Sequence, residues 1–394
     1  MEVEAQVPAR TQLVRRASEL VPLLQRNSTW TEENRRLHEE SIEALADAGI
    51  FKMRVPARYG GYESDARTMV EVAAQLGQGD GSTSWTASVW WITTWMAGLF
   101  PDKVQDEVFS TPNVRVCGTL SPTAMAAPAN GGVTVNGKWG FISGALHSHW
   151  QMVVAISAMP DGTQGPIMAA VPMSDLEIVD DWHTAGLRGT GSVTTVAADV
   201  FIPAERILPL GAMLHEQYAS AQNSKAPIFG SPLLPTASTS SVGTAIGLAR
   251  AARNVFFERL PDRHITYTSY ASQREAPLTH LQVADATLKS DAAEFHAHRL
   301  ADLVDAKSAS GDPWTLEERA RARVDMGRAC QLAQEAVDIL RRASGGASVY
   351  SAVPIQRIER DMQSVNLHAL MHPDTNLELY GRILCGLEPN TFYI

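Results

Sequence analysis

Three residues whose side chains could bind a ligand or take part in a reaction lie close together in one short segment. They are Phe141 with its ring, Ser143 with its hydroxyl and His147 with its imidazole. The segment 137–147 is typical of a strand that runs into a glycine turn. Strand alternation would point Phe141 and Ser143 to the same face. Such a pair could pack against a flat apolar ring system and hydrogen-bond its edge. A buried core phenylalanine beside a satisfied serine explains the same pattern, so this segment alone leaves both interpretations open.

A second group of candidates is aromatic. Trp91 and Trp95 are spaced i, i+4, so they share one face of a predicted helix. Buried aromatic walls suit a flat polycyclic substrate. Ordinary core packing explains the two tryptophans equally well.

Composition narrows the class of protein. The chain has 394 residues, is 45% hydrophobic and carries a net charge of −10 with scattered basic residues. This balance argues against nucleic acid and anionic membranes as partners. The sequence shows no apolar run long enough to span a bilayer and no apolar leader, so we expect a cytoplasmic protein. The three cysteines are far apart and the paired histidines lack nearby carboxylates, so we expect no disulfide and no metal site.

The predicted secondary structure changes twice along the chain. We predict helices over 1–112, short strands forming a β-barrel or sandwich over 113–212, and helices again over 213–394. Thr29 and Glu32 read as a capping box that starts a helix. A late helix is expected over 354–371.

Several common motifs are missing from the sequence. No GxGxxG follows a predicted strand, and no P-loop, HExxH or GxSxG pattern is present. The chain therefore shows no Rossmann site of its own, and the common kinase and hydrolase classes drop out.

At this point the chain resembles the acyl-CoA dehydrogenase superfamily over nearly its whole length. The landmarks appear in the family's order, at 55–61, 139–144, 186–190, 199–203 and 344–346. The resemblance implies an α+β fold with an N-terminal helical domain, a central β-barrel or sandwich and a C-terminal four-helix bundle. It also implies that Phe141, Ser143 and Trp139 lie against a flavin, with the Ser143 hydroxyl bonded to flavin N5. Gly345 and Gly346 resemble the turn that approaches the flavin pyrophosphate across a subunit interface.

Departures from that family point to a subfamily. The Thr-Glu-Pro strand end of the dehydrogenases is replaced by Leu120, a serine and a proline, and we find no matching catalytic carboxylate. The pattern that begins at Arg360 and Asp361 and ends at His368 resembles the two-component flavin-dependent monooxygenases, which hydroxylate phenols and, in some members, indoles.

That resemblance implies reduced FAD, with FMN as the alternative, delivered by a separate NAD(P)H:flavin reductase. The flavin would form a C4a-hydroperoxide, and a dry pocket would protect it. His368 is expected to be the base that activates a phenol or an indole N–H. His147, Trp91, Trp95 and Leu120 are expected to contact the substrate, and the assembly is expected to be a homotetramer.

Rival interpretations remain at this stage. An N-oxygenase acting on an amine or amino sugar would share Ser143 but need a polar pocket. An acyl-CoA oxidoreductase would need the missing carboxylate. A flavin-free helical assembly protein would keep only the fold.

Overall fold

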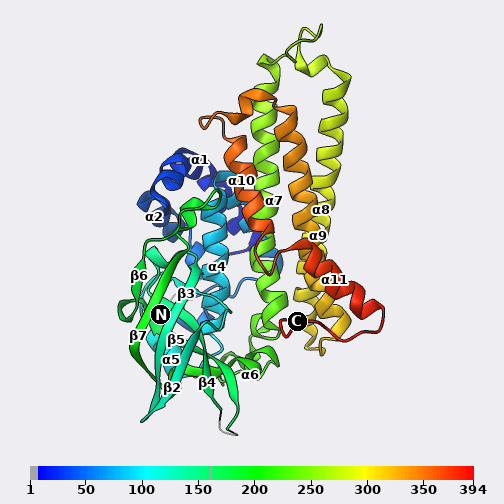
Figure 1. The fold of residues 1–394 in the computed structure, drawn as a ribbon. Helices are drawn as coiled ribbons and strands as arrows, with labels where there is room; N and C mark the ends of the chain where they lie inside the picture. Colours follow the sequence, from blue (N-terminus) through cyan, green and yellow to red (C-terminus); the bar gives the residue numbers. More distant parts are fainter. Residues whose placement is uncertain (1–7, 160–161) are drawn as a thin grey trace, which may run out of the picture.

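The computed structural model describes residues 8–159 and 162–394. Helices come first along the chain, a sheet follows, and long helices complete the fold (Figure 1). This order confirms the predicted fold class. The N-terminal helices are α1 (Arg10–Asn34), α2 (Glu39–Asp47), α3 (Ala66–Gly79), α4 (Gly81–Ala97) and α5 (Asp102–Val108).

Helix α4 is the central element of the molecule. Nearly all of its residues are buried, because it packs against the sheet on one side and against the C-terminal helices on the other. Figure 1 shows it running between these two layers. A helix buried on all sides is apolar around its whole circumference, which explains its dense set of tryptophans.

The predicted capping box at Thr29 and Glu32 is wrong. Both residues lie inside α1, which continues without a break until Arg35 adopts a left-handed conformation with φ 55°. The i, i+3 spacing of a capping box also occurs within helices, so the pattern alone does not mark a start. A genuine capping box joins Thr315 and Glu318 at the start of a later helix.

The central layer is one mixed sheet of eight strands. The strands are β1 (Val116–Gly118), β2 (Ala124–Ala129), β3 (Gly132–Ile142), β4 (Trp150–Ala158), β5 (Gln164–Pro172), β6 (Glu177–Val179), β7 (Val193–Pro203) and β8 (Ile207–Pro209). The order is β6-β7-β3-β2-β4-β5-β8, with β1 added parallel to β4. The β2 sequence is rich in alanine and contains Pro128, so it lacks the β-branched signal of a strand.

The C-terminal layer is built from long antiparallel helices (Figure 1). They are α7 (Leu233–Arg259), α8 (Pro277–Ser310), α9 (Leu316–Ala343) and α10 (Ile355–Asn366), with the shorter α6 (Leu210–Leu214) and α11 (Pro373–Leu384) at the edges. Gly247 lets α7 approach α3 closely, because a Cβ there would lie 2.6 Å from the carbonyl oxygen of Ala74. Across the described residues, no helix is long and apolar enough to cross a membrane.

The late helix predicted over 354–371 is shorter in the structure. Helix α10 ends at Asn366, and His368 lies in the loop that leads to Pro373, the first residue of α11. The extra turn was predicted because leucine and alanine continue the helical pattern beyond the end of α10.

Candidate active site

Ser143 stands at the end of a chain of three hydroxyls. It follows the last residue of β3 and is 5% exposed. Its Oγ lies 2.7 Å from Oγ of Ser192, which lies 2.6 Å from Oγ1 of Thr190. The Thr190 hydroxyl donates to the carbonyl oxygen of Leu187 at 2.8 Å.

The carbonyl at the end of this chain fixes its direction. A carbonyl oxygen only accepts, so Thr190 uses its single proton on Leu187. Ser192 must then donate to Thr190, and Ser143 must donate to Ser192. The Ser143 oxygen is left as an acceptor for other groups.

Trp85, on α4, joins Ser143 to His368. Its indole Nε1 donates to Ser143 Oγ at 3.1 Å. Its ring meets the His368 ring edge-on, with centroids 4.9 Å apart and planes at 65°. The structure thus brings the two predicted catalytic residues to the same indole, although they are far apart in sequence.

The surroundings of His368 favour its neutral form. The residue is exposed at the surface, and the protein atoms packed around its imidazole lower its pKa to about 4 through desolvation. The ordinary pKa of an imidazole is about 6.5. Nδ1 accepts from the Leu370 N–H at 3.3 Å, which is long for such a bond. A tautomer with its proton on Nδ1 would lose only this weak hydrogen bond, and its Nε2 would be free to accept a proton.

Phe141 and Ser143 do not share a face of a regular strand, so that expectation is wrong. The β3–β7 pairing shifts register between Trp139 and Ile142, and Phe141 has φ 62°. A left-handed residue breaks the alternation of a strand. The Phe141 ring is consequently 75% exposed, while Ser143 is buried. The exposed ring meets Trp182 edge-on at 5.7 Å.

Three predicted aromatic contacts lie in the core. Trp139, Trp91 and Trp95 are at most 1% exposed. Each indole N–H is used on a backbone carbonyl, at 2.7–2.8 Å: those of Val154, Ile50 and Ile228, respectively. Buried rings with satisfied donors leave no surface for a ligand, so we leave these three out of the candidate site. Trp85 is buried as well, at 5% exposed, and it belongs to the candidate site only through its contacts with Ser143 and His368.

His147 and Leu120 lie away from the Trp85 indole's contacts. His147 is in the 3-10 helix η3 (Ala145–His147), and burial lowers its pKa to about 4, with nearby Arg36 and Arg115 acting in the same direction. Its Nε2 is buried and has no partner among the described residues. The Leu120 carbonyl accepts from the Tyr393 hydroxyl at 2.8 Å, so that strand end is held by the C-terminal segment.

Gly345 and Gly346 form an exposed turn beside two arginines that the sequence did not reveal. Gly345 has φ 63°, and a Cβ there would lie 3.3 Å from Arg263 Nη2. Arg263 Nε and Arg259 Nη1 are buried and have no hydrogen-bond partner among the described residues. Burial, and then repulsion from Arg259, lowers the pKa of Arg263. An arginine beside a glycine turn, with a second arginine near it and a buried unpartnered nitrogen on each, suits an anionic group.

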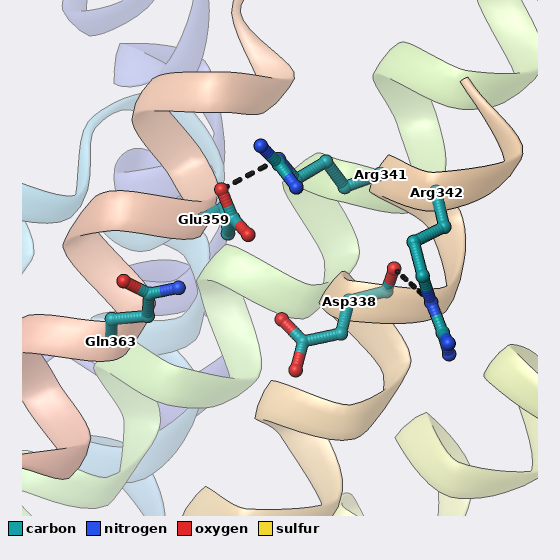
Figure 2. Close-up of a pocket in the computed structure, with 5 residues that line it drawn as sticks. All are labelled: Asp338, Arg341, Arg342, Glu359 and Gln363. Carbon is teal, nitrogen blue, oxygen red and sulfur yellow. Dashed lines mark hydrogen bonds and ion pairs between the residues drawn. The ribbon is translucent and has the colours of Figure 1, made fainter. Parts of the chain in front are cut away.

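A separate cavity of about 330 Å³ lies between α9 and α10. Figure 2 shows its charged lining, with Arg341 and Glu359 pointing toward each other. Their ion pair spans 2.7 Å. None of the predicted site residues lines this cavity. In the described ranges, no cluster of three or more histidine, cysteine or acidic side chains is arranged to hold a metal ion.

The residues present fit a flavin. Phe141 offers an exposed ring, Ser143 an acceptor, and the orphaned nitrogens of Arg259 and Arg263 offer donors to phosphate oxygens. An exposed aromatic ring beside a buried hydroxyl matches a ring system with a polar edge.

Comparisons with known proteins agree with this chemistry. The models described as acyl-CoA dehydrogenase, N-terminal domain, and acyl-CoA dehydrogenase, C-terminal domain, match residues 12–107 and 239–373. The flavin-dependent monooxygenase oxygenase subunit HsaA of Mycobacterium tuberculosis is 31% identical over 94% of both chains. The FADH(2)-dependent resorcinol hydroxylase oxygenase component of Rhizobium sp. is 30% identical over 99% of this chain and 98% of that protein.

Solved structures give the same result. XiaF from Streptomyces sp., in complex with FADH2 and glycerol, superposes with a TM-score of 0.91 and 30% identity over 97% of each chain. The chain thus belongs to the flavin-dependent monooxygenases of the acyl-CoA dehydrogenase fold, and it is an oxygenase component that works with reduced flavin.

Proposed function

We propose that this oxygenase hydroxylates an electron-rich aromatic compound, a phenol or an indole-type ring, with reduced FAD from a separate reductase. The balance is one substrate, one O2 and one reduced flavin giving hydroxylated substrate, water and oxidised flavin. The bound flavin supplies two electrons and activates dioxygen. The observation that carries the proposal is that Ser143 and His368 both contact the Trp85 indole.

Ser143 can accept the hydrogen bond that a reduced flavin donates. Its proton is committed to Ser192, so its oxygen can accept from the protonated N5 edge of the reduced ring. Phe141 would cover the ring face. Together they would hold the isoalloxazine in place and keep water from its reactive edge, which limits loss of oxygen as hydrogen peroxide.

His368 would act on the substrate. Its lowered pKa keeps the imidazole unprotonated, so a ring nitrogen is free to accept a proton from a phenol or an indole N–H, but it also makes the imidazole a weaker base. Removing that proton raises the electron density of the ring carbon that receives oxygen. Trp85 would hold the imidazole by its edge contact.

FAD is favoured over FMN by the arginines beside the glycine turn. Arg263 has an unused donor and lies next to Gly345, Arg259 has an unused donor near Arg263, and a pyrophosphate presents more acceptors than a single phosphate. We expect Arg263→Gln to weaken FAD binding roughly 10–100-fold, as for loss of a charge-assisted bond, with a smaller loss for FMN. Equal losses for both flavins, measured by titration, would place the arginine away from the pyrophosphate.

A homo-oligomer, expected to be a tetramer, would bring this turn to a neighbouring subunit. Helix α8 exposes a row of large apolar side chains, each 55–72% exposed: Leu278, Leu281, Leu288 and Phe295. Apolar residues on one helix face are typical of an interface between copies. Light scattering on Leu288→Glu should show a smaller assembly than the parent chain.

We place the enzyme in the cytoplasm, where NADH and a reductase supply reduced flavin.

The decisive test is product formation. The enzyme is incubated with a flavin reductase, NADH, FAD and a panel of phenols, indoles and amines, and products are scored by mass for the gain of one oxygen atom. We expect gain on at least one phenol or indole and none without the oxygenase. Oxygenation confined to amines would support an N-oxygenase instead.

A further inference from the structure

The backbone of Leu187 connects the residues proposed to touch the flavin. Its carbonyl oxygen accepts from Thr190 Oγ1 at 2.8 Å and from Trp182 Nε1 at 3.0 Å. The Thr190 branch leads through Ser192 to Ser143. The Trp182 branch leads to the exposed ring of Phe141. One carbonyl therefore orients both branches.

Leu187 itself is held in an unfavourable conformation. Its φ is 49°, in the left-handed region that a branched side chain rarely adopts. Such a conformation persists only where surrounding contacts enforce it. Its N–H donates to Asp361 Oδ1 at 2.6 Å, so one contact that enforces it comes from α10.

Asp361 sits where α10, α4 and the 186–192 loop meet. It is 3% exposed. A Cβ added to Gly81, the first residue of α4, would lie 3.0 Å from Asp361 Oδ2, and a Cβ added to Gly186 would collide with the Arg360 carbonyl. Both glycines therefore allow their segments to close on α10. Trp85 lies one helical turn beyond Gly81, and His368 lies in the loop after α10.

We propose that Asp361 is a positioning residue for the flavin side of the site. By accepting the Leu187 N–H, it fixes the carbonyl that orients the Ser143 hydroxyl chain and the Trp182–Phe141 contact. It touches neither flavin nor substrate. Its catalytic consequence rests on the proposed function, whereas its structural action does not.

Because of the charges around Asp361, its effect on Leu187 depends on its acceptor oxygen and not on its negative charge. Asp80 caps α4, Glu32 reaches in from α1, and Arg357 lies on α10. Burial, and then repulsion from Asp80, raises the pKa of Asp361 to about 7. Either protonation state retains an oxygen that accepts from Leu187. An asparagine would retain one too, and a leucine of similar size would not.

The test compares Asp361→Leu with Asp361→Asn in the full-length enzyme, using two readouts. The first is hydrogen peroxide released per reduced flavin oxidised, with reductase and an accepted substrate present. The second is amide hydrogen exchange of residues 182–193 without flavin. We expect Asp361→Leu to raise peroxide release at least threefold and to speed exchange at least tenfold, values typical of losing about one hydrogen bond. We expect Asp361→Asn to stay within twofold of the parent enzyme in both.

Two further variants complete the test. Glu359→Gln alters the same helix but faces Arg341, so it should match the parent enzyme. Thr190→Val should raise peroxide release by cutting the Ser143 branch, and it carries the test if Asp361→Leu fails to fold. Parent-like exchange in Asp361→Leu, an Asp361→Asn variant as impaired as the leucine variant, or parent-like coupling in Thr190→Val would overturn the proposal. Absence of any oxygenated product from the parent enzyme would instead overturn the proposed function, leaving the exchange measurement to decide on Asp361.

Discussion

The indole nitrogen of Trp85 lies 3.1 Å from the hydroxyl oxygen of Ser143, and this bond ties helix α4 to the end of strand β3. The ring of the same side chain also contacts His368, in the loop after α10. Three segments from three parts of the chain thus meet at one ring. A shift of any of them would change the spacing between the groups proposed to hold flavin and substrate.

Replacing Ser143 by alanine should uncouple the enzyme. The change removes the acceptor proposed for the flavin N5 edge, and one hydrogen bond of about 1–1.5 kcal/mol corresponds to a roughly tenfold change. We expect about tenfold more hydrogen peroxide per turnover, measured by a peroxidase-coupled assay. Ser148→Ala is the matched control, because Ser148 lies in the same loop as Ser143 and its hydroxyl likewise accepts from an α4 tryptophan, Trp90. Equal leakage from both variants would remove Ser143 from this role.

Trp85→Phe should have a smaller effect in the same direction. Phenylalanine keeps a ring to pack against His368 but loses the donor to Ser143, whose hydroxyl is then held only by its bond to Ser192. We expect peroxide leakage between that of the parent enzyme and that of Ser143→Ala. Trp90→Phe removes the corresponding donor to Ser148 and serves as the control. Leakage from Trp85→Phe no greater than from this control would mean that the indole bond does not hold the serine.

The order of helical and β segments could be predicted from the sequence, because the spacing of apolar residues follows the period and the solvent exposure of each element. Ser143 was a candidate from its local pattern, whereas the role of His368 came from the resemblance to the two-component flavin-dependent monooxygenases. Trp85 could not be chosen over Trp91 and Trp95, since the i, i+4 rule says which residues share a face but not what that face meets. Helix α4 is buried all round, so each tryptophan meets a different neighbour.

The geometry at Phe141 was also beyond the sequence. The register shift that turns this residue outward arises from the pairing of β3 with β7, which are distant along the chain. The same holds for Arg259 and Arg263, whose lack of partners depends on how the segment after α7 folds against the Gly345 turn. Such features depend on tertiary contacts, which local propensity does not encode.

His368→Ala should slow oxygen transfer while leaving the oxidation of reduced flavin by O2 unchanged. General base catalysis contributes on the order of 10² to 10⁴ in rate, so we expect at least a hundredfold loss of product formation in single-turnover mixing. Because the pKa of His368 is lowered to about 4, the parent rate should show no titration of this group between pH 6 and 8. His280→Ala, on the exposed part of α8, is the control. Normal product formation in His368→Ala would assign the base elsewhere.

The last prediction concerns stability and pH at Asp361. Its pKa in the folded protein is about 7, raised from the ordinary value of 3.8. A raised pKa means that the folded state binds the proton more tightly, so its stabilising contribution is complete below about pH 4 and is lost as the pH rises through 7. Asparagine cannot lose a proton, and Asp361→Asn should therefore escape this loss.

We expect the difference in Tm between Asp361→Asn and the parent chain to become more positive from pH 5 to pH 8. One pKa unit corresponds to about 1.4 kcal/mol, so the change should amount to several degrees in differential scanning fluorimetry. Asp312→Asn, in an exposed loop, should show a difference that does not vary with pH. A constant difference for Asp361→Asn as well would mean that this carboxyl group keeps its ordinary pKa, because solvent or a cation reaches the junction between α4 and α10.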